Sequence, residues 1–135
     1  MIKAKKVFRP LTSKDVCRIY ELLHEHKLVS FPLNKESEGK IDSLVANIIN
    51  KYYGKEIYLS TEQKAIAYLY FIIKDHAFID GNKRTAVLSF EVFCELNDLK
   101  LKHPELTLDS LAVFIEKITE SDHHEVIRAL AKVMF

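Results

Sequence analysis

Residues 65–73 form the most apolar stretch of the chain, with a hydrophobic side chain at every position. A helix that is hydrophobic on all sides has to be buried on all sides. Ser60 and Gln63 have the spacing of a capping box, and together with the apolar run they predict a helix over residues 62–75. Because the run is far shorter than the ~18 residues of a membrane span, it predicts a central core helix and no membrane segment.

Hydrophobic residues at helical spacing continue on both sides of this core segment. They predict helices over residues 12–27, 41–49, 84–96, 111–118 and 126–133. Residues 28–39 hold Pro32 and Gly39 among polar residues and predict a loop. With only three Gly and three Pro in 135 residues, the chain has few signals for tight turns. We therefore predict an all-α fold, a single compact helical domain of about six helices spanning residues 1–135.

Charge and cysteine content exclude several classes of function. The formal net charge of +1 lacks the basic excess of a dedicated nucleic-acid binder, so no nucleic-acid partner is expected. Cys17 and Cys94 each lie in an apolar, helix-like stretch, and the N-terminus has no secretory signal. This combination predicts a cytoplasmic protein whose two thiols are buried and reduced.

The short run at residues 76–84, His-Ala-Phe-Ile-Asp-Gly-Asn-Lys-Arg, joins two of the apolar helices. It contains more ionisable side chains than a connecting turn requires. His76 is a candidate general base, and Asp80 is a candidate metal-binding carboxylate. Gly81 permits a sharp turn and a close approach of the backbone to a ligand. A phosphate at the start of the next helix would meet free N–H groups and the guanidinium of Arg84.

A simpler interpretation of the same residues is structural. Asp80 or Asn82 would cap the following helix, and Lys83 and Arg84 would lie on its exposed face. The run also lacks the two-glycine spacing of a Walker phosphate-binding loop.

The run matches a longer motif, His-x-Phe-x-Asp/Glu-Gly/Ala-Asn-x-Arg, at every specified position. The matching residues are His76, Phe78, Asp80, Gly81, Asn82 and Arg84. The chain thus resembles the Fic/Doc superfamily, and the lysine before the arginine is similar to the death-on-curing (Doc) branch. The resemblance implies a Fic/Doc-like fold in which an active loop joins two central buried helices.

The resemblance also implies roles for individual residues. His76 would be the base for a target hydroxyl, and Asp80 would hold Mg²⁺. Gly81, Asn82, Lys83 and Arg84 would surround the phosphates of ATP. We interpret Phe78 as an anchor that packs the loop onto the core.

Two positions depart from the branch of the family that transfers AMP. That branch has glycine where this chain has Lys83, and a second arginine where this chain has Val87. The similarity to the Doc branch implies that ATP binds in the reverse sense and gives its γ-phosphate to a protein hydroxyl. AMP transfer and a non-catalytic module that binds nucleotide or protein remain as alternatives.

The Doc resemblance implies partners as well. The target would be a protein, and the resemblance implies a component of the translation machinery. The chain would be the toxin of a toxin–antitoxin pair, restrained by a separate antitoxin polypeptide whose disordered segment folds as a helix in a groove beside Arg84.

Lys55, Glu56, Ile57 and Tyr58 have two interpretations. One is an ordinary connection before the core helix. The other is a counterpart of the family's flap, an extended segment that docks the target's backbone near the active loop.

Two further patterns do not support a site. Ser121 to Glu125 begins like the family's self-inhibitory motif, but Val126 stands where glycine or asparagine belongs. The histidines at 24, 26, 123 and 124 do not converge on one ion, because neighbouring residues on a helix point about 100° apart. We interpret them as residues at helix ends.

Overall fold

The computed structural model describes residues 8–49, 51–52, 55–56, 58, 60–104, 108–119 and 122–135. Its helices are α1 (Ser13–Glu25), α2 (Lys35–Ile49), α3 (Thr61–Lys74), α4 (Asn82–Leu96), α5 (Leu108–Lys117) and α6 (His123–Met134). A two-residue ladder pairs β1 (Lys51–Tyr52) with β2 (Lys55–Glu56) in antiparallel register. The predicted all-α fold is confirmed for the described residues.

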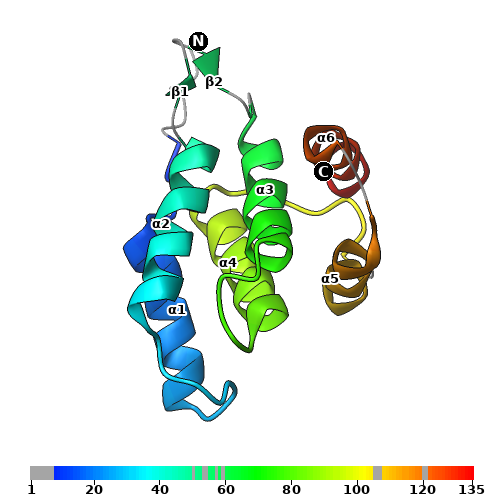
Figure 1. Cartoon of the computed structure of the whole chain (residues 1–135). Helices are drawn as coiled ribbons and strands as arrows, with labels where there is room; N and C mark the ends of the chain where they lie inside the picture. Colours follow the sequence, from blue (N-terminus) through cyan, green and yellow to red (C-terminus); the bar gives the residue numbers. More distant parts are fainter. Residues whose placement is uncertain are drawn as a thin grey trace.

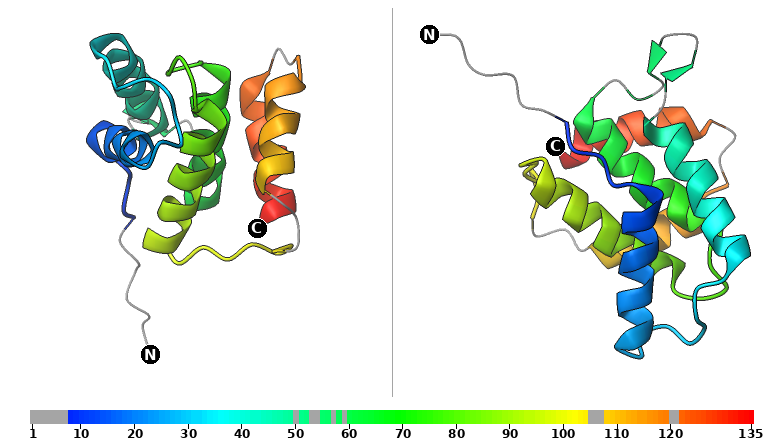
Figure 2. Two further views of the ribbon diagram at one scale, coloured as in Figure 1. Left: turned by 90° about the horizontal axis from the view of Figure 1, so that it is seen from below. Right: turned by 90° about the vertical axis from the view of Figure 1, so that its left-hand side faces the viewer.

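The helices pack in pairs, which form three layers (Figure 2, left). One outer layer holds α1 and α2, the middle layer holds α3 and α4, and the other outer layer holds α5 and α6. The central helix α3 contacts α2, α4, α5 and α6. Residues 65–70 of α3 are all 0% exposed, as the unbroken apolar run predicted. Figure 1 shows the loop between α3 and α4 at one end of this middle layer.

The loop predicted over residues 28–39 is too long at its C-terminal end. α2 already begins at Lys35, because the Asn34 side chain caps the helix by accepting a hydrogen bond from the Ser37 N–H at 2.8 Å. Gly39 lies inside the helix, where a Cβ atom would meet nothing within 4 Å. Glycine favours loops, but one exposed glycine costs a helix only about 1 kcal/mol.

The histidines at the start of α6 bind two tyrosines, Tyr70 of α3 and Tyr58 just before it. The Tyr70 hydroxyl lies 2.5 Å from Nδ1 of His123, and the Tyr58 hydroxyl lies 2.8 Å from Nδ1 of His124. Both tyrosine side chains are almost fully buried. These two histidines therefore dock α6 onto the core.

Both cysteines are free and buried, as predicted. No helix within the described ranges is long and apolar enough to cross a membrane.

Candidate active site

The loop between α3 and α4, residues 75–81, is called the active loop below. Two of its residues have left-handed backbone conformations, His76 with φ 45° and Gly81 with φ 80°. A left-handed conformation costs a non-glycine residue roughly 1 kcal/mol or more. The surrounding contacts must therefore hold the His76 backbone in place.

Two side chains hold the active loop on the core. The ring of Phe78 is buried and stacks on Tyr20 of α1, with ring centroids 4.1 Å apart. The Asn82 carboxamide accepts a hydrogen bond from the Phe78 N–H at 2.9 Å and donates one to the Phe78 carbonyl at 2.8 Å. Phe78 thus has the contacts of an anchor. The side chain of Asn82 serves the loop itself, a role that the motif alone does not reveal.

A second loop, residues 26–34 between α1 and α2, lies against the active loop. The Ser30 N–H donates to Oδ2 of Asp80 at 3.1 Å, and the Arg84 guanidinium donates to the Leu28 carbonyl at 2.6 Å. Buried Val29 lies so close to Gly81 that a Cβ atom at position 81 would approach its Cγ1 to 2.2 Å. Sequence reasoning missed these residues because the second loop carries no motif of its own.

A groove of about 420 Å³ opens beside the active loop. Its lining residues are Leu28, His76, Asp80, Gly81, Asn82, Lys83, Arg84 and Glu116. The candidate base, carboxylate and phosphate ligands therefore share one cavity. His76, Asp80 and Arg84 are exposed to solvent. Two lining residues, Leu28 and Glu116, were not identified from the sequence, where nothing distinguishes them from other surface residues.

The start of α4 has the electrostatic character of an anion site. Asn82, Lys83 and Arg84 form its first turn, which is described throughout and carries no acidic side chain. Gly81 is the N-cap residue, and no side chain among the described residues caps the helix. The purely structural interpretation of Asp80 and Asn82 as helix caps is therefore wrong. The N–H groups of the first turn and the helix dipole favour a negative ligand at this end of α4.

Asp80 has the chemistry to bind a magnesium ion. Its Oδ2 atom is oriented by the Ser30 N–H, which leaves Oδ1 without a hydrogen-bond partner among the described residues. Mg²⁺ is commonly held by one or two carboxylates together with substrate phosphates and water. A single exposed carboxylate beside an anion site fits that donor set.

The possible docking flap begins at the other end of α3 from the active loop. Lys55 and Glu56 form β2, which precedes the N-terminus of α3, whereas the active loop follows the C-terminus of α3 (Figure 1). A 14-residue helix separates its ends by about 21 Å at ~1.5 Å per residue. Tyr58 is 2% exposed and belongs to the core, while Ile57 lies outside the described residues.

The incomplete self-inhibitory motif also lies away from the groove. Glu125 is in the first turn of α6, which is capped by Asp122, and it lines a different cavity with Ser60 and Gln63. Ser121 lies outside the described residues. Besides Asp80, the carboxylate that lines the groove is Glu116 of α5.

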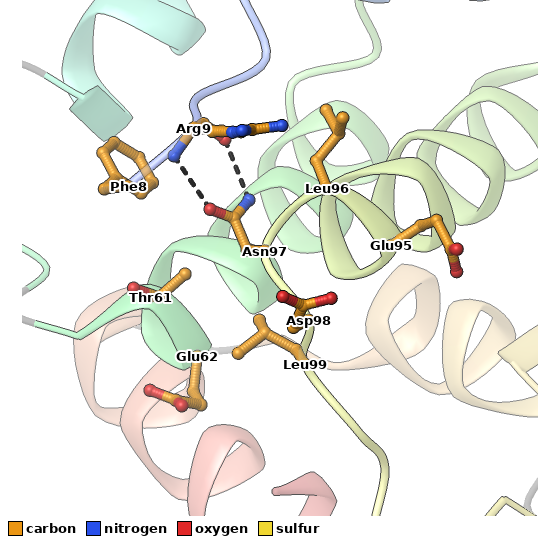
Figure 3. Close-up of a pocket in the computed structure, with 9 residues that line it drawn as sticks. All are labelled: Phe8, Arg9, Thr61, Glu62, Glu95, Leu96, Asn97, Asp98 and Leu99. Atoms are coloured by element: carbon orange, nitrogen blue, oxygen red, sulfur yellow. Dashed lines mark hydrogen bonds between the residues drawn. The ribbon is translucent and has the colours of Figure 1, made fainter. Parts of the chain in front are cut away.

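A larger hollow of about 610 Å³ lies elsewhere, between the N-terminal segment and the end of α4 (Figure 3). The Asn97 carboxamide there accepts from the Arg9 N–H and donates to the Arg9 carbonyl, each at 2.8 Å. Three carboxylates line this hollow, those of Glu62, Glu95 and Asp98. Their negative charge opposes phosphate binding, so the smaller groove is the better candidate for a nucleotide.

Comparisons with known proteins agree with the motif. The model of the Fic/DOC family matches residues 10–94, which include both loops and end within α4. The chain is 36% identical to Toxin Doc of Mycolicibacterium smegmatis over 63 residues. This matched segment covers 47% of this chain and 48% of that protein. The matched segment thus spans about half the length of the curated relative. No solved structure matches the chain significantly.

Proposed function

This chain belongs to the Fic/DOC family, and on that premise we propose that it transfers the γ-phosphate of ATP to a hydroxyl group on a protein. The main support is that one groove collects a base, a carboxylate, an uncapped helix N-terminus and two cations. Phosphoryl transfer needs little covalent chemistry from the protein. It needs positioning of the reactants and stabilisation of charge on the phosphate oxygens.

Each group then has a defined part in the reaction. His76 accepts the proton of the attacking hydroxyl. Arg84 and the N–H groups at the start of α4 hold phosphate oxygens. Asp80 holds Mg²⁺, which supplies neutralisation of phosphate charge. Gly81 keeps the backbone close to the phosphates, and the side chain of Asn82 keeps the active loop in shape.

Lys83 favours transfer of phosphate over transfer of AMP. Its ammonium group lies in the groove at the first turn of α4, where the AMP-transferring branch has glycine. A lysine at this position places a positive charge beside the end of the ATP triphosphate that enters the groove. Val87 is a further departure, because it offers no guanidinium for a second phosphate.

The target docks beside the second loop rather than at residues 55–58. Leu28, Phe31 and Ile79 are 49%, 45% and 66% exposed, and they belong to the two loops that frame the groove. Large exposed apolar side chains around a polar cleft are typical of a protein-binding surface. The target itself is a protein, and a component of the translation machinery is the first to test.

A transfer assay with two labelled forms of ATP tests the activity even while the target is unidentified. The purified chain is added with Mg²⁺ to a bacterial translation extract, with the label on either the γ- or the α-phosphate. The proposal expects protein labelling from γ-labelled ATP only. His76→Ala removes the base at an exposed position. Protein labelling with this variant measures the background from kinases of the extract.

The outcomes of this assay separate the candidate functions. Labelling from the α-phosphate would mean AMP transfer and would overturn the proposal. If wild type and His76→Ala give the same labelling from either ATP while wild type still binds ATP, the chain is a binding module.

A toxin held in check by a separate antitoxin is part of the same proposal. Expression of the chain alone is expected to slow the growth of a bacterial host, and His76→Ala should relieve it. Normal growth with wild type, combined with toxicity of Glu125→Ala, would instead place the restraint within this chain.

A further inference from the structure

Two opposite charges meet within the groove. Nζ of Lys83, in the first turn of α4, lies 3.2 Å from Oε1 of Glu116 on α5. Both residues line the groove. In addition to Asp80, a second carboxylate is therefore built into a cavity where Lys83, Arg84 and the start of α4 attract anions.

The position of Glu116 follows from the way α5 is packed. Ala112 and Ile115 face the core at 1% and 0% exposure. The Lys74 ammonium of α3 donates to the Ile118 carbonyl, just beyond the end of α5. Glu116 directly follows buried Ile115, so its side chain leaves the helix about 100° around the axis from that of Ile115. At this position Glu116 lines the groove beside Lys83.

Folding stability gives little reason for the pair. The side chains of Lys83 and Glu116 are 44% and 39% exposed, and ion pairs that are open to solvent contribute little to stability. The charge of Glu116 has a larger effect on a bound anion than the ion pair has on folding stability. A negative charge next to the phosphate site repels the ligand and also occupies the cation that would bind it.

We propose that Glu116 is a specificity residue, which holds Lys83 while the groove is empty and has to be displaced by the terminal phosphate of a nucleotide. This inference rests on the proposed nucleotide site. Only a ligand with enough negative charge can replace Glu116 as the partner of Lys83. Glu116 thus weakens the binding of every phosphate ligand. Whether a nucleotide occupies the groove then depends on how many of its phosphates reach Lys83. It lies outside residues 10–94, the part that matches the family.

Binding measurements on Glu116→Gln test this inference. Isothermal titration of the whole chain with a non-hydrolysable ATP analogue and Mg²⁺ gives Kd without any need for turnover. Removal of the charge is expected to lower Kd by roughly 3- to 10-fold, a size set by one charge a few ångströms away in a solvated groove. Glu116→Asp keeps the charge and should stay closer to wild type. Adenosine, which has no phosphate, should bind all variants alike.

Two further variants separate a specific role from a general change in net charge. Glu91→Gln removes one exposed carboxylate of α4 that does not line the groove, and it should leave Kd unchanged. In a Lys83→Met background, Glu116→Gln should have a smaller effect, because part of its action passes through Lys83. A double-mutant cycle gives this coupling directly.

The possible outcomes are distinct. If wild type binds the ATP analogue and Glu116→Gln binds it no more tightly, Glu116 has no such role and the proposed function stands. An equal gain in affinity with Glu91→Gln would also overturn the inference, since net charge would then explain it. If no variant binds nucleotide, the proposed function fails and this inference fails with it.

Discussion

The rings of Tyr20 and Phe78 stack with their planes 9° apart and their centroids 4.1 Å apart. The hydroxyl of the same tyrosine donates a hydrogen bond to the Phe31 carbonyl at 2.6 Å. One side chain of α1 therefore holds both loops of the groove, the active loop through its ring and the second loop through its hydroxyl. The shape of the groove depends on a residue that does not line it.

Substitutions at Tyr20 should separate these two contacts. Tyr20→Phe keeps the stack but leaves the Phe31 carbonyl without its donor, so we expect a loss of about 1 kcal/mol of stability. Tyr20→Leu also removes the stacked ring from a buried site and should cost about 2–4 kcal/mol. Urea denaturation measures both effects. Hydrogen exchange of Tyr20→Phe should be faster in residues 28–34 than in residues 75–81, and the reverse pattern would contradict this assignment.

Gly81 and Gly39 form a matched pair for alanine substitution. At position 81 the backbone has φ 80° and the added Cβ would approach Val29 to 2.2 Å. We therefore expect Gly81→Ala to destabilise the protein by about 1–3 kcal/mol. At position 39, within α2, nothing lies within 4 Å of the added Cβ. Gly39→Ala should stabilise the protein by about 0.4–1 kcal/mol. Thermal or urea denaturation compares the two variants.

Val29→Ala is the control that shows why Gly81→Ala loses stability. If the contact with Val29 accounts for much of the damage, Gly81→Ala should lose less stability in a Val29→Ala background than in wild type. A loss of equal size in both backgrounds would assign the whole effect to the backbone conformation.

Substitutions at Asn82 should separate its role in folding from the effect of charge on ligand binding. Asn82→Ala removes both hydrogen bonds to the Phe78 backbone, and at about 1 kcal/mol each the loss of stability should be about 2 kcal/mol. Asn82→Asp can still accept from the Phe78 N–H but cannot donate to its carbonyl, and it adds a negative charge at the anion site. We expect Asn82→Asp to fold better than Asn82→Ala and to bind the ATP analogue more weakly. Denaturation and titration calorimetry provide the two measurements.

Both cysteines should be inert in the folded protein. Burial raises the pKa of Cys94 to about 12, and burial, followed by the nearby acidic residues, raises that of Cys17 to about 11. Since the thiolate is the reactive form, iodoacetamide should label neither residue at pH 8 until urea unfolds the chain. Rapid labelling of the native protein would contradict the burial of these thiols.

The same raised pKa values predict how stability depends on pH. The unfolded thiols ionise near the ordinary value of 9.0, whereas the folded ones ionise only at about 11 and about 12. Their contribution to stability is therefore complete below about pH 9 and is lost as the pH rises towards 11 and beyond. The Cys17→Ala/Cys94→Ala double variant should lose less stability than wild type between pH 9 and 11, as measured by urea denaturation.

Local patterns in the sequence determined most of the fold. The apolar run at residues 65–73 predicted a buried helix, and α3 is the helix that packs against both outer layers. The cap at Ser60 was also correctly assigned, since its hydroxyl accepts from the Gln63 N–H at 3.0 Å. Both signals act within a few residues of chain, so helical periodicity and capping chemistry are sufficient to identify them. The start of α2 was misplaced because Gly39 and Asn34 support opposite predictions at short range.

The sequence alone also supplied the candidate residues of the active loop, because a motif of six fixed positions is contiguous in the chain. Only the tertiary structure showed what surrounds that loop. Ser30 and Asp80 are 50 residues apart in the chain, and Leu28 and Arg84 are 56 apart, yet they meet at one groove. The sequence left residues 55–58 with two interpretations, a connection or a docking flap, and only the fold shows that α3 separates Lys55 and Glu56 from the active loop. Glu116 became visible only through the packing of α5. Contacts of this kind depend on how helices are placed against one another, and no local periodicity encodes them.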